Sequence, residues 1–131
     1  MARRCRVLII EDDNEIQNLL RNALSLEGYE ATTTGITSGE LDSAALSGYD
    51  IVIIDLASTA SAGRAAAMRA RALGAGVIVV GSDPIREGEG IGHAYIMKPL
   101  SLSGISELIR ETLEQTRAEC DAPPGPSSRV A

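Results

Sequence analysis

The sequence predicts a doubly wound α/β fold, in which a five-stranded parallel sheet is covered by helices on both faces. Short apolar runs such as Arg6–Ile10 and Ile51–Asp55 lack polar alternation, which is typical of strands buried on both faces. Segments with helical spacing of apolar residues separate these runs. The length of 131 residues and the 44% hydrophobic content suit one globular domain.

Five strands are predicted from apolar and β-branched runs, and they cover Arg6–Ile10, Tyr29–Thr33, Ile51–Asp55, Gly76–Val80 and Ala94–Met97. Because helical segments alternate with these strands, right-handed crossovers and a parallel sheet are expected. The ligand site of such a sheet lies beyond the carboxyl ends of its strands.

The first helix is indicated by apolar residues spaced along one helical face: Ile16, Leu19, Leu20, Ala23 and Leu24. Asn14 and Gln17 are placed as a capping box at its start, and Gly28 is placed to end it.

Three later helices are predicted: a short one marked by Leu41, Ala44 and Ala45 that ends at Gly48, an Ala-rich one over Arg64–Leu73, and a last one that starts near Ser101 or Ser103. The apolar stripe of the last helix consists of Ile105, Leu108, Ile109 and Leu113.

Two segments are expected to lack regular structure. Gly81–Gly92 holds four glycines and one proline, so a fourth helix there is expected to be shortened or lost. From Asp121 the chain reads DAPPGPSSRVA, which predicts a disordered tail over 121–131 after a domain over 1–120.

Charge and composition exclude several classes of protein. The net charge of −6 opposes direct binding to nucleic acid, and no apolar run is long enough to span a membrane or to serve as a signal peptide. A cytoplasmic protein is therefore expected. Cys5 and Cys120 lie near opposite ends without metal-ligand spacing, so we expect incidental thiols, with neither a disulfide nor a zinc site.

Polar residues follow four of the predicted strands and are expected to converge: Glu11, Asp12, Asp13, Asp55, Ser82 and Lys98. Carboxylates this close repel one another unless a cation binds, and their hard oxygen ligands favour Mg²⁺. A divalent ion, a free carboxylate, a hydroxyl and an ammonium are what phosphoryl transfer to a carboxylate requires. Asp55 is the natural nucleophile.

These residues carry a family resemblance. The segments LIIEDDNEI, YDIVIIDL, VIVVGSD and AYIMKPL, in this order, resemble the receiver domain of two-component response regulators over about residues 5–117. The resemblance implies a flavodoxin-like sheet and a phosphorylation switch. Because no effector domain follows residue 120, we expect a stand-alone receiver.

The resemblance makes Asp55 the phosphoacceptor. It makes Glu11 and Asp12 the acidic metal-binding pair, with Asp12 the expected direct ligand, and the backbone carbonyl of Ala57 a further protein ligand to Mg²⁺. Asp13 is then a neighbour near the start of the first helix, where negative charge suits the helix dipole.

Three further roles follow from the resemblance. Ser82 would hydrogen-bond the phosphoryl group, Lys98 would pair with it, and Tyr95 would change rotamer when the Ser82 hydroxyl moves. The Lys98–Pro99 peptide bond would be cis.

The implied function is a switch that accepts a phosphoryl group from a histidine kinase or phosphotransfer protein and signals by binding a downstream protein. The switch is not an enzyme in the usual sense, although it can dephosphorylate itself slowly. An alternative is an atypical receiver that acts as a phosphorylation-independent interaction module. A phosphatase is disfavoured because Ala57 stands where a general acid is needed. His93 is expected to be a surface side chain and not a phosphate carrier.

The sequence departs from the family pattern in three places. Only 16 positions separate Ser82 from Lys98, about six fewer than usual, or more than one and a half helical turns. Thr59 stands where the family usually has proline, which predicts a mobile loop over LASTASAG after Asp55. Asp83 follows Ser82, and its carboxylate would repel a phosphoryl group.

Overall fold

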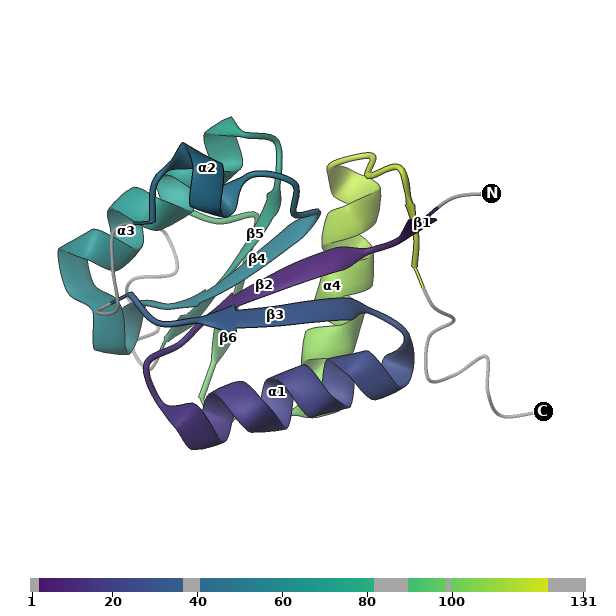
Figure 1. The fold of residues 1–131 in the computed structure, drawn as a ribbon, viewed down its shortest axis with the longest axis horizontal. Helices are drawn as coiled ribbons and strands as arrows, with labels where there is room; N and C mark the ends of the chain where they lie inside the picture. Colours follow the sequence, from purple (N-terminus) through teal and green to yellow (C-terminus); the bar gives the residue numbers. More distant parts are fainter. Residues whose placement is uncertain (1–2, 37–40, 82–89, 99, 123–131) are drawn as a thin grey trace.

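The computed structural model describes residues 3–36, 41–81, 90–98 and 100–122, without the side chains of 57–61. Its central sheet has five parallel strands in the order β3-β2-β4-β5-β6 (Figure 1). The strands are β2 (Arg6–Ile10), β3 (Glu30–Thr34), β4 (Ile51–Asp55), β5 (Gly76–Gly81) and β6 (Ala94–Met97). The predicted strands and the doubly wound fold are confirmed.

Side chains alternate between two cores because successive residues of a strand point to opposite faces. In β2, Val7 and Ile9 enter one core, whereas Leu8 and Ile10 enter the other. The first core is closed by α1 (Asn14–Glu27) and α4 (Leu102–Gln115). The second is closed by α2 (Ser43–Leu46) and α3 (Leu56–Ala72). Both faces are therefore covered, which explains the uninterrupted apolar runs (Figure 1).

Helix α1 begins one residue earlier than the predicted capping box requires. Its N-cap is Asp13, whose Oδ1 accepts the N–H groups of Glu15 (2.9 Å) and Ile16 (3.3 Å). The side chain of Gln17 instead donates to the carbonyl of Glu11. The Asn14 capping box is thus wrong, because a carboxylate at Asp13 already satisfies the free N–H groups of the first turn.

Two further helix boundaries were predicted from a glycine at the end of α1 and a serine at the start of α4. Gly28 ends α1 with a left-handed φ of 107°, as predicted. Ser101 caps α4, and its Oγ accepts the N–H of Gly104 at 3.3 Å, which settles the choice between Ser101 and Ser103.

Helix α3 overturns the expected loop. LASTASAG forms its first turns, and the helix begins at Leu56, directly after Asp55. Alanine has the highest helix propensity, and α3 packs through Ala66, Ala67 and Ala70 on the sheet. Once that face is packed, extending the helix toward its N-terminus adds one hydrogen bond per residue.

The connection from β5 to β6 lacks a helix in its described part, residues 90–93. Residues 82–89 lie outside the described residues. Four helices serve the five-stranded sheet in the described ranges, in keeping with the shortened fourth helix expected from the sequence.

A second, two-stranded sheet joins the ends of the domain. In it, β1 (Arg3–Arg4) pairs in parallel with β7 (Cys120–Asp121). Cys5 and Cys120 form a disulfide with their Cα atoms 4.9 Å apart, so the prediction of two incidental thiols is wrong. The two residues are 115 positions apart in sequence, and only the fold brings them together.

The predicted tail begins inside this small sheet, since Asp121 belongs to β7. Residues 123–131 lie outside the described residues, and the proposed division at residue 120 stays a prediction. Among the described helices, none combines the length and the apolarity that crossing a bilayer demands.

Candidate functional site at the strand ends

Two buried carboxylates meet at the carboxyl ends of adjacent strands. Asp55 ends β4 and is 2% exposed, and Glu11 follows β2 and is 4% exposed. Lys98 follows β6, and its Nζ lies 2.6 Å from Oδ2 of Asp55. The Lys98 N–H donates to the carbonyl of Gly81 at 3.0 Å, which fixes its backbone at the end of β5. The structure thus brings together Glu11, Asp55 and Lys98, as predicted from their order along the chain.

The electrostatics of the site follow from this packing. Burial, and then a hydrogen bond shared with Asp55, raise the pKa of Glu11 to about 7. The Asp55 carboxylate, through its hydrogen bond and its charge, raises the pKa of Lys98. Two carboxyl groups in contact therefore hold a proton more tightly than either does alone, and one ammonium offsets their charge.

Asp12 and Asp13 accept hydrogen bonds from the backbone. Oδ1 of Asp12 accepts the N–H of Ile36 at 2.9 Å, which ties the chain after β3 to the end of β2. Asp13 caps α1, and its own N–H donates to Oε1 of Glu11 at 3.1 Å. Hence Asp12, the expected direct metal ligand, serves here as a backbone acceptor.

The residue types at this site fit Mg²⁺. Glu11 and Asp55 offer buried oxygen ligands whose mutual repulsion a divalent ion would relieve, and Asp12 adds a third carboxylate next in sequence. Within the described ranges, the ligand atoms that cluster within 4.8 Å belong to Cys5, Asp50 and Cys120, not to these acids. Direct binding of one ion by Glu11, Asp12 and Asp55 together would therefore need their carboxylates to lie closer to one another than they do here.

Ala57, the remaining predicted ligand, is the second residue of α3. Carbonyl groups in an α-helix point toward its C-terminal end, away from the strand-end crevice. The Ala57 carbonyl reaches a metal beside Asp55 only if this first turn opens. Its role stays a prediction.

Several predicted features fall on residues that the structure does not describe. These are the Ser82 hydroxyl, the Asp83 carboxylate and the peptide bond to Pro99. The Thr59 side chain also lies outside the described residues, and only its place within α3 is known.

Tyr95 lies on the α3 side of the sheet and packs against Gly81. A β-carbon at Gly81 would meet the Tyr95 Oη at 2.5 Å and its Cζ at 3.2 Å, so any larger residue there requires the ring to move. Sequence reasoning missed Gly81. The sequence feature that could have indicated it is a glycine that ends the β-branched run of β5. This strand pairs with β6, which carries Tyr95.

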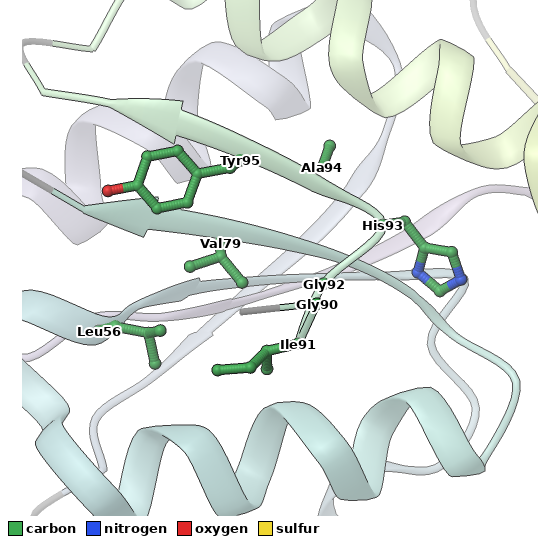
Figure 2. Close-up of a pocket in the computed structure, with 8 residues that line it drawn as sticks. All are labelled: Leu56, Val79, Gly90, Ile91, Gly92, His93, Ala94 and Tyr95. Atoms are coloured by element: carbon green, nitrogen blue, oxygen red, sulfur yellow. The ribbon is translucent and has the colours of Figure 1, made fainter. Parts of the chain in front are cut away.

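A pocket of about 230 Å³ opens beside Tyr95, between the β5–β6 edge and α3. Figure 2 shows Tyr95 and Leu56 toward one end of this pocket, His93 at the other, and Val79 between them. The pocket is lined also by Gly90–His93, the described end of the β5–β6 connection, and by Ala94 at the start of β6.

His93 is not the free surface side chain expected from the sequence. It is half-buried, and its Nδ1 accepts the N–H of Val77 at 3.0 Å. Burial and the nearby charge of Arg71 lower the pKa of His93. The side chain acts as an acceptor at the end of the sheet ladder.

Comparisons with known proteins address the fold. The receiver domain (CheY-like) of a response regulator from Methanospirillum hungatei superposes with a TM-score of 0.70, at 23% identity, over 88% of this chain and 98% of that one. The response regulator TrrA of Thermotoga maritima, solved with Mg²⁺ and BeF, gives a TM-score of 0.64, at 23% identity, over 83% of this chain and 99% of that one.

The chain has the receiver fold of response regulators. This receiver fold accounts for the 2-1-3-4-5 order in which the five strands are arranged. No family model matches the chain.

Sequence relatives agree with the receiver fold. The nisin biosynthesis regulatory protein NisR of Lactococcus lactis is 29% identical over 116 residues, which make up 84% of this chain and 51% of NisR. The uncharacterized transcriptional regulatory protein YkoG of Bacillus subtilis is also 29% identical over 116 residues, 83% of this chain and 51% of YkoG. The chain spans about half the length of these curated relatives.

Proposed function

We propose that this chain is a phosphorylation-dependent switch of a two-component system, with Asp55 as its phosphoacceptor. The observation that carries the proposal is the buried Asp55 carboxylate at the end of β4, 2.6 Å from the ammonium of Lys98. A carboxylate in this place can act as a nucleophile, and the adjacent ammonium can stabilise the negative charge of the phosphoryl group after transfer.

In the proposed reaction, one carboxylate oxygen of Asp55 forms a bond to phosphorus. The phosphorus–nitrogen bond of a phosphohistidine breaks, and the donor imidazole nitrogen keeps the electron pair and takes up a proton. Lys98, which pairs with Asp55 in the unmodified protein, then offers its N–H groups to a phosphoryl oxygen. The donor is a histidine kinase or a phosphotransfer protein.

Glu11, Asp12 and Asp55 would hold Mg²⁺, with the Ala57 carbonyl joining them when the start of α3 opens. The ion supplies charge neutralisation for the developing phosphoryl charge. The complex of TrrA with Mg²⁺ and BeF supports the use of this ion by a protein of similar fold.

The switch is proposed to signal through protein binding in the cytoplasm, without turning over a substrate beyond its own slow dephosphorylation. Ser82 and Tyr95 are the proposed switch residues. The packing of Tyr95 on Gly81, the residue before Ser82, supports a coupling between them.

Intact mass after incubation with acetyl phosphate and Mg²⁺ tests the proposal. We expect one phosphoryl adduct that requires the metal, that disappears in Asp55→Asn, and that persists in Asp121→Asn, a matched change at an exposed aspartate. Circular dichroism establishes that each variant folds. A wild-type protein that folds but takes up no phosphoryl group contradicts the proposal and favours the phosphorylation-independent interaction module.

A further inference from the structure

The disulfide between Cys5 and Cys120 lies at the edge of the molecule opposite the strand-end site. It joins the chain just before β2 to β7, at the amino-terminal ends of the strands, whereas Asp55 lies at their carboxyl ends (Figure 1). It therefore has no part in the phosphoryl chemistry proposed above.

Little besides this bond holds the described C-terminal segment to the domain. Helix α4 ends at Gln115, and Ala118 is the last residue before Cys120 that packs against the core. Beyond it, Glu119 is exposed, and β7 is a strand of two residues paired with the exposed β1. A pairing this short is not stable by itself in water.

The partner strand has an anchor of its own. Arg3 in β1 donates to both carboxylate oxygens of Asp50, at 2.7 and 2.8 Å, and the N–H of Arg6 donates to Oδ2 at 2.8 Å. If the disulfide opened, β1 would stay in place, and β7 would be the element that leaves.

The two sulfurs differ in access. Cys5 is 0% exposed and belongs to the core with Val7 and Leu113, whereas Cys120 is only partly buried. An attacking thiolate must approach along the S–S axis, so it reaches Cys120 first. A thiolate left at Cys5 would lie in an apolar core near the Asp50 carboxylate, which favours the closed disulfide.

We propose that Cys5–Cys120 is a redox-modifiable latch that low-molecular-weight thiols open by attack on Cys120, releasing the segment Glu119–Asp121 that contains β7. The incoming thiolate forms a bond to Sγ of Cys120, and Cys5 leaves with the electron pair and takes up a proton. A second thiol attacks the mixed disulfide and frees Cys120. The two thiols supply both electrons and depart as their own disulfide.

Partial reduction of the oxidised wild type tests the direction of attack. With reduced glutathione as the probe and an acid quench, we expect the mixed disulfide to form on Cys120 at least about tenfold faster than on Cys5. Mass spectrometry of the quenched peptides locates the bound glutathione. Equal labelling of the two cysteines, or faster labelling of Cys5, would overturn the assignment of Cys120 as the attacked sulfur.

Backbone NMR relaxation of the full chain tests the release. On reduction of the oxidised protein, we expect the amides of Glu119–Asp121 to gain fast motion while those of Arg3 and β2 do not. Cys5→Ala with and without reductant is the control and should not change. An unchanged Glu119–Asp121 segment, or a protein that keeps two free thiols after mild oxidation, would overturn the latch.

Discussion

Glu11 and Asp55 meet, both buried, between the ends of β2 and β4, and this contact governs the energetics of the strand-end site. Both side chains lie on the face covered by α1 and α4, as the alternation of β2 and β4 dictates. The positive charge of Lys98 offsets the repulsion between the two carboxyl groups.

Replacing Glu11 by Gln is expected to stabilise the metal-free protein at pH 8 by roughly 1–3 kcal/mol. The pKa of Glu11 is raised to about 7, so its ionised form is disfavoured in the folded state, and stability falls as pH rises from about 4.5 to about 7. Gln copies the protonated form and removes that loss. Urea unfolding in EDTA at pH 5 and pH 8 measures the effect.

The same variant is expected to bind Mg²⁺ about tenfold more weakly, because it has lost one carboxylate. Isothermal titration with Mg²⁺ provides this second readout. The gain in stability from Glu11→Gln over the wild type should be larger at pH 8 than at pH 5. An equal gain at both pH values would show that the two carboxyl groups do not share a proton.

Gly81→Ala is expected to destabilise the fold by about 1–3 kcal/mol, because the new β-carbon would lie 2.5 Å from the Tyr95 Oη. Gly104→Ala is the matched control: its β-carbon meets nothing closer than 3.6 Å, and an alanine in a helix costs nothing. In a Tyr95→Ala background the cost of Gly81→Ala should largely vanish. Urea unfolding of the wild type, the three single variants and the double variant checks this. An equal cost of Gly81→Ala in both backgrounds would show that the strain does not come from Tyr95.

At the scale of elements, the connection from β5 to β6 is the main departure from a regular doubly wound sheet. Strand β6 has four residues and lies at the edge of the sheet. His93, just before β6, extends the pairing of β6 with β5 by two hydrogen bonds. The His93 N–H donates to the carbonyl of Val77 at 2.7 Å, and the His93 Nδ1 accepts the Val77 N–H at 3.0 Å. A side chain thus supplies an acceptor to the ladder.

This arrangement predicts a pH dependence. Because burial, and then Arg71, lower the pKa of His93, the unfolded chain takes up the proton first, and stability is lost as pH falls below about 6.5 toward the folded-state pKa. Protonated His93 can no longer accept from Val77.

The NMR titration of His93 checks the shift directly, because the chain has one histidine. His93→Asn keeps an acceptor that does not titrate, so between pH 7.5 and 5.5 the wild type should lose up to about 1 kcal/mol relative to it. Glu11 changes the stability of both proteins with pH in the opposite direction, so subtracting one stability from the other removes its contribution. A His93 pKa at or above 6.5 would contradict the prediction.

At the scale of the whole molecule, the disulfide joins positions 5 and 120 and so encloses nearly the entire domain. Closing so long a loop in the unfolded chain lowers its conformational entropy, which stabilises the folded state. The two cores on either side of the sheet are built from medium-sized aliphatic side chains, with Tyr29 as the largest fully buried one among the described residues.

Cys120→Ser is expected to lower the free energy of unfolding by about 2–5 kcal/mol. Reductant added to the wild type should have the same effect, whereas reductant added to Cys120→Ser should have none. Thermal unfolding with and without dithiothreitol measures all four cases. Wild-type protein that is equally stable in both would mean that the disulfide does not form in solution.

The sequence by itself determined what local patterns encode. The apolar runs of β2 and β4 could be assigned because a strand buried on both faces needs no polar residue along its length. Since parallel strands end at one edge of the sheet, the order of Glu11, Asp55 and Lys98 along the chain was enough to predict that they meet there. Gly28 ended α1 for an equally local reason, its left-handed backbone.

The tertiary structure decided what depends on contacts between distant residues. Nothing near Cys5 in sequence indicates that the Cα of Cys120 lies 4.9 Å away, because their approach follows from the packing of α4 against the sheet. Asp12 is next to Glu11 in sequence, yet its Oδ1 accepts the N–H of Ile36, a contact that only the fold creates. Helix α3 begins at Leu56 because its packing on the sheet stabilises a first turn whose own sequence only weakly favours a helix. Local propensity therefore determines which elements form, and long-range packing determines where they start and which side chains they bring together.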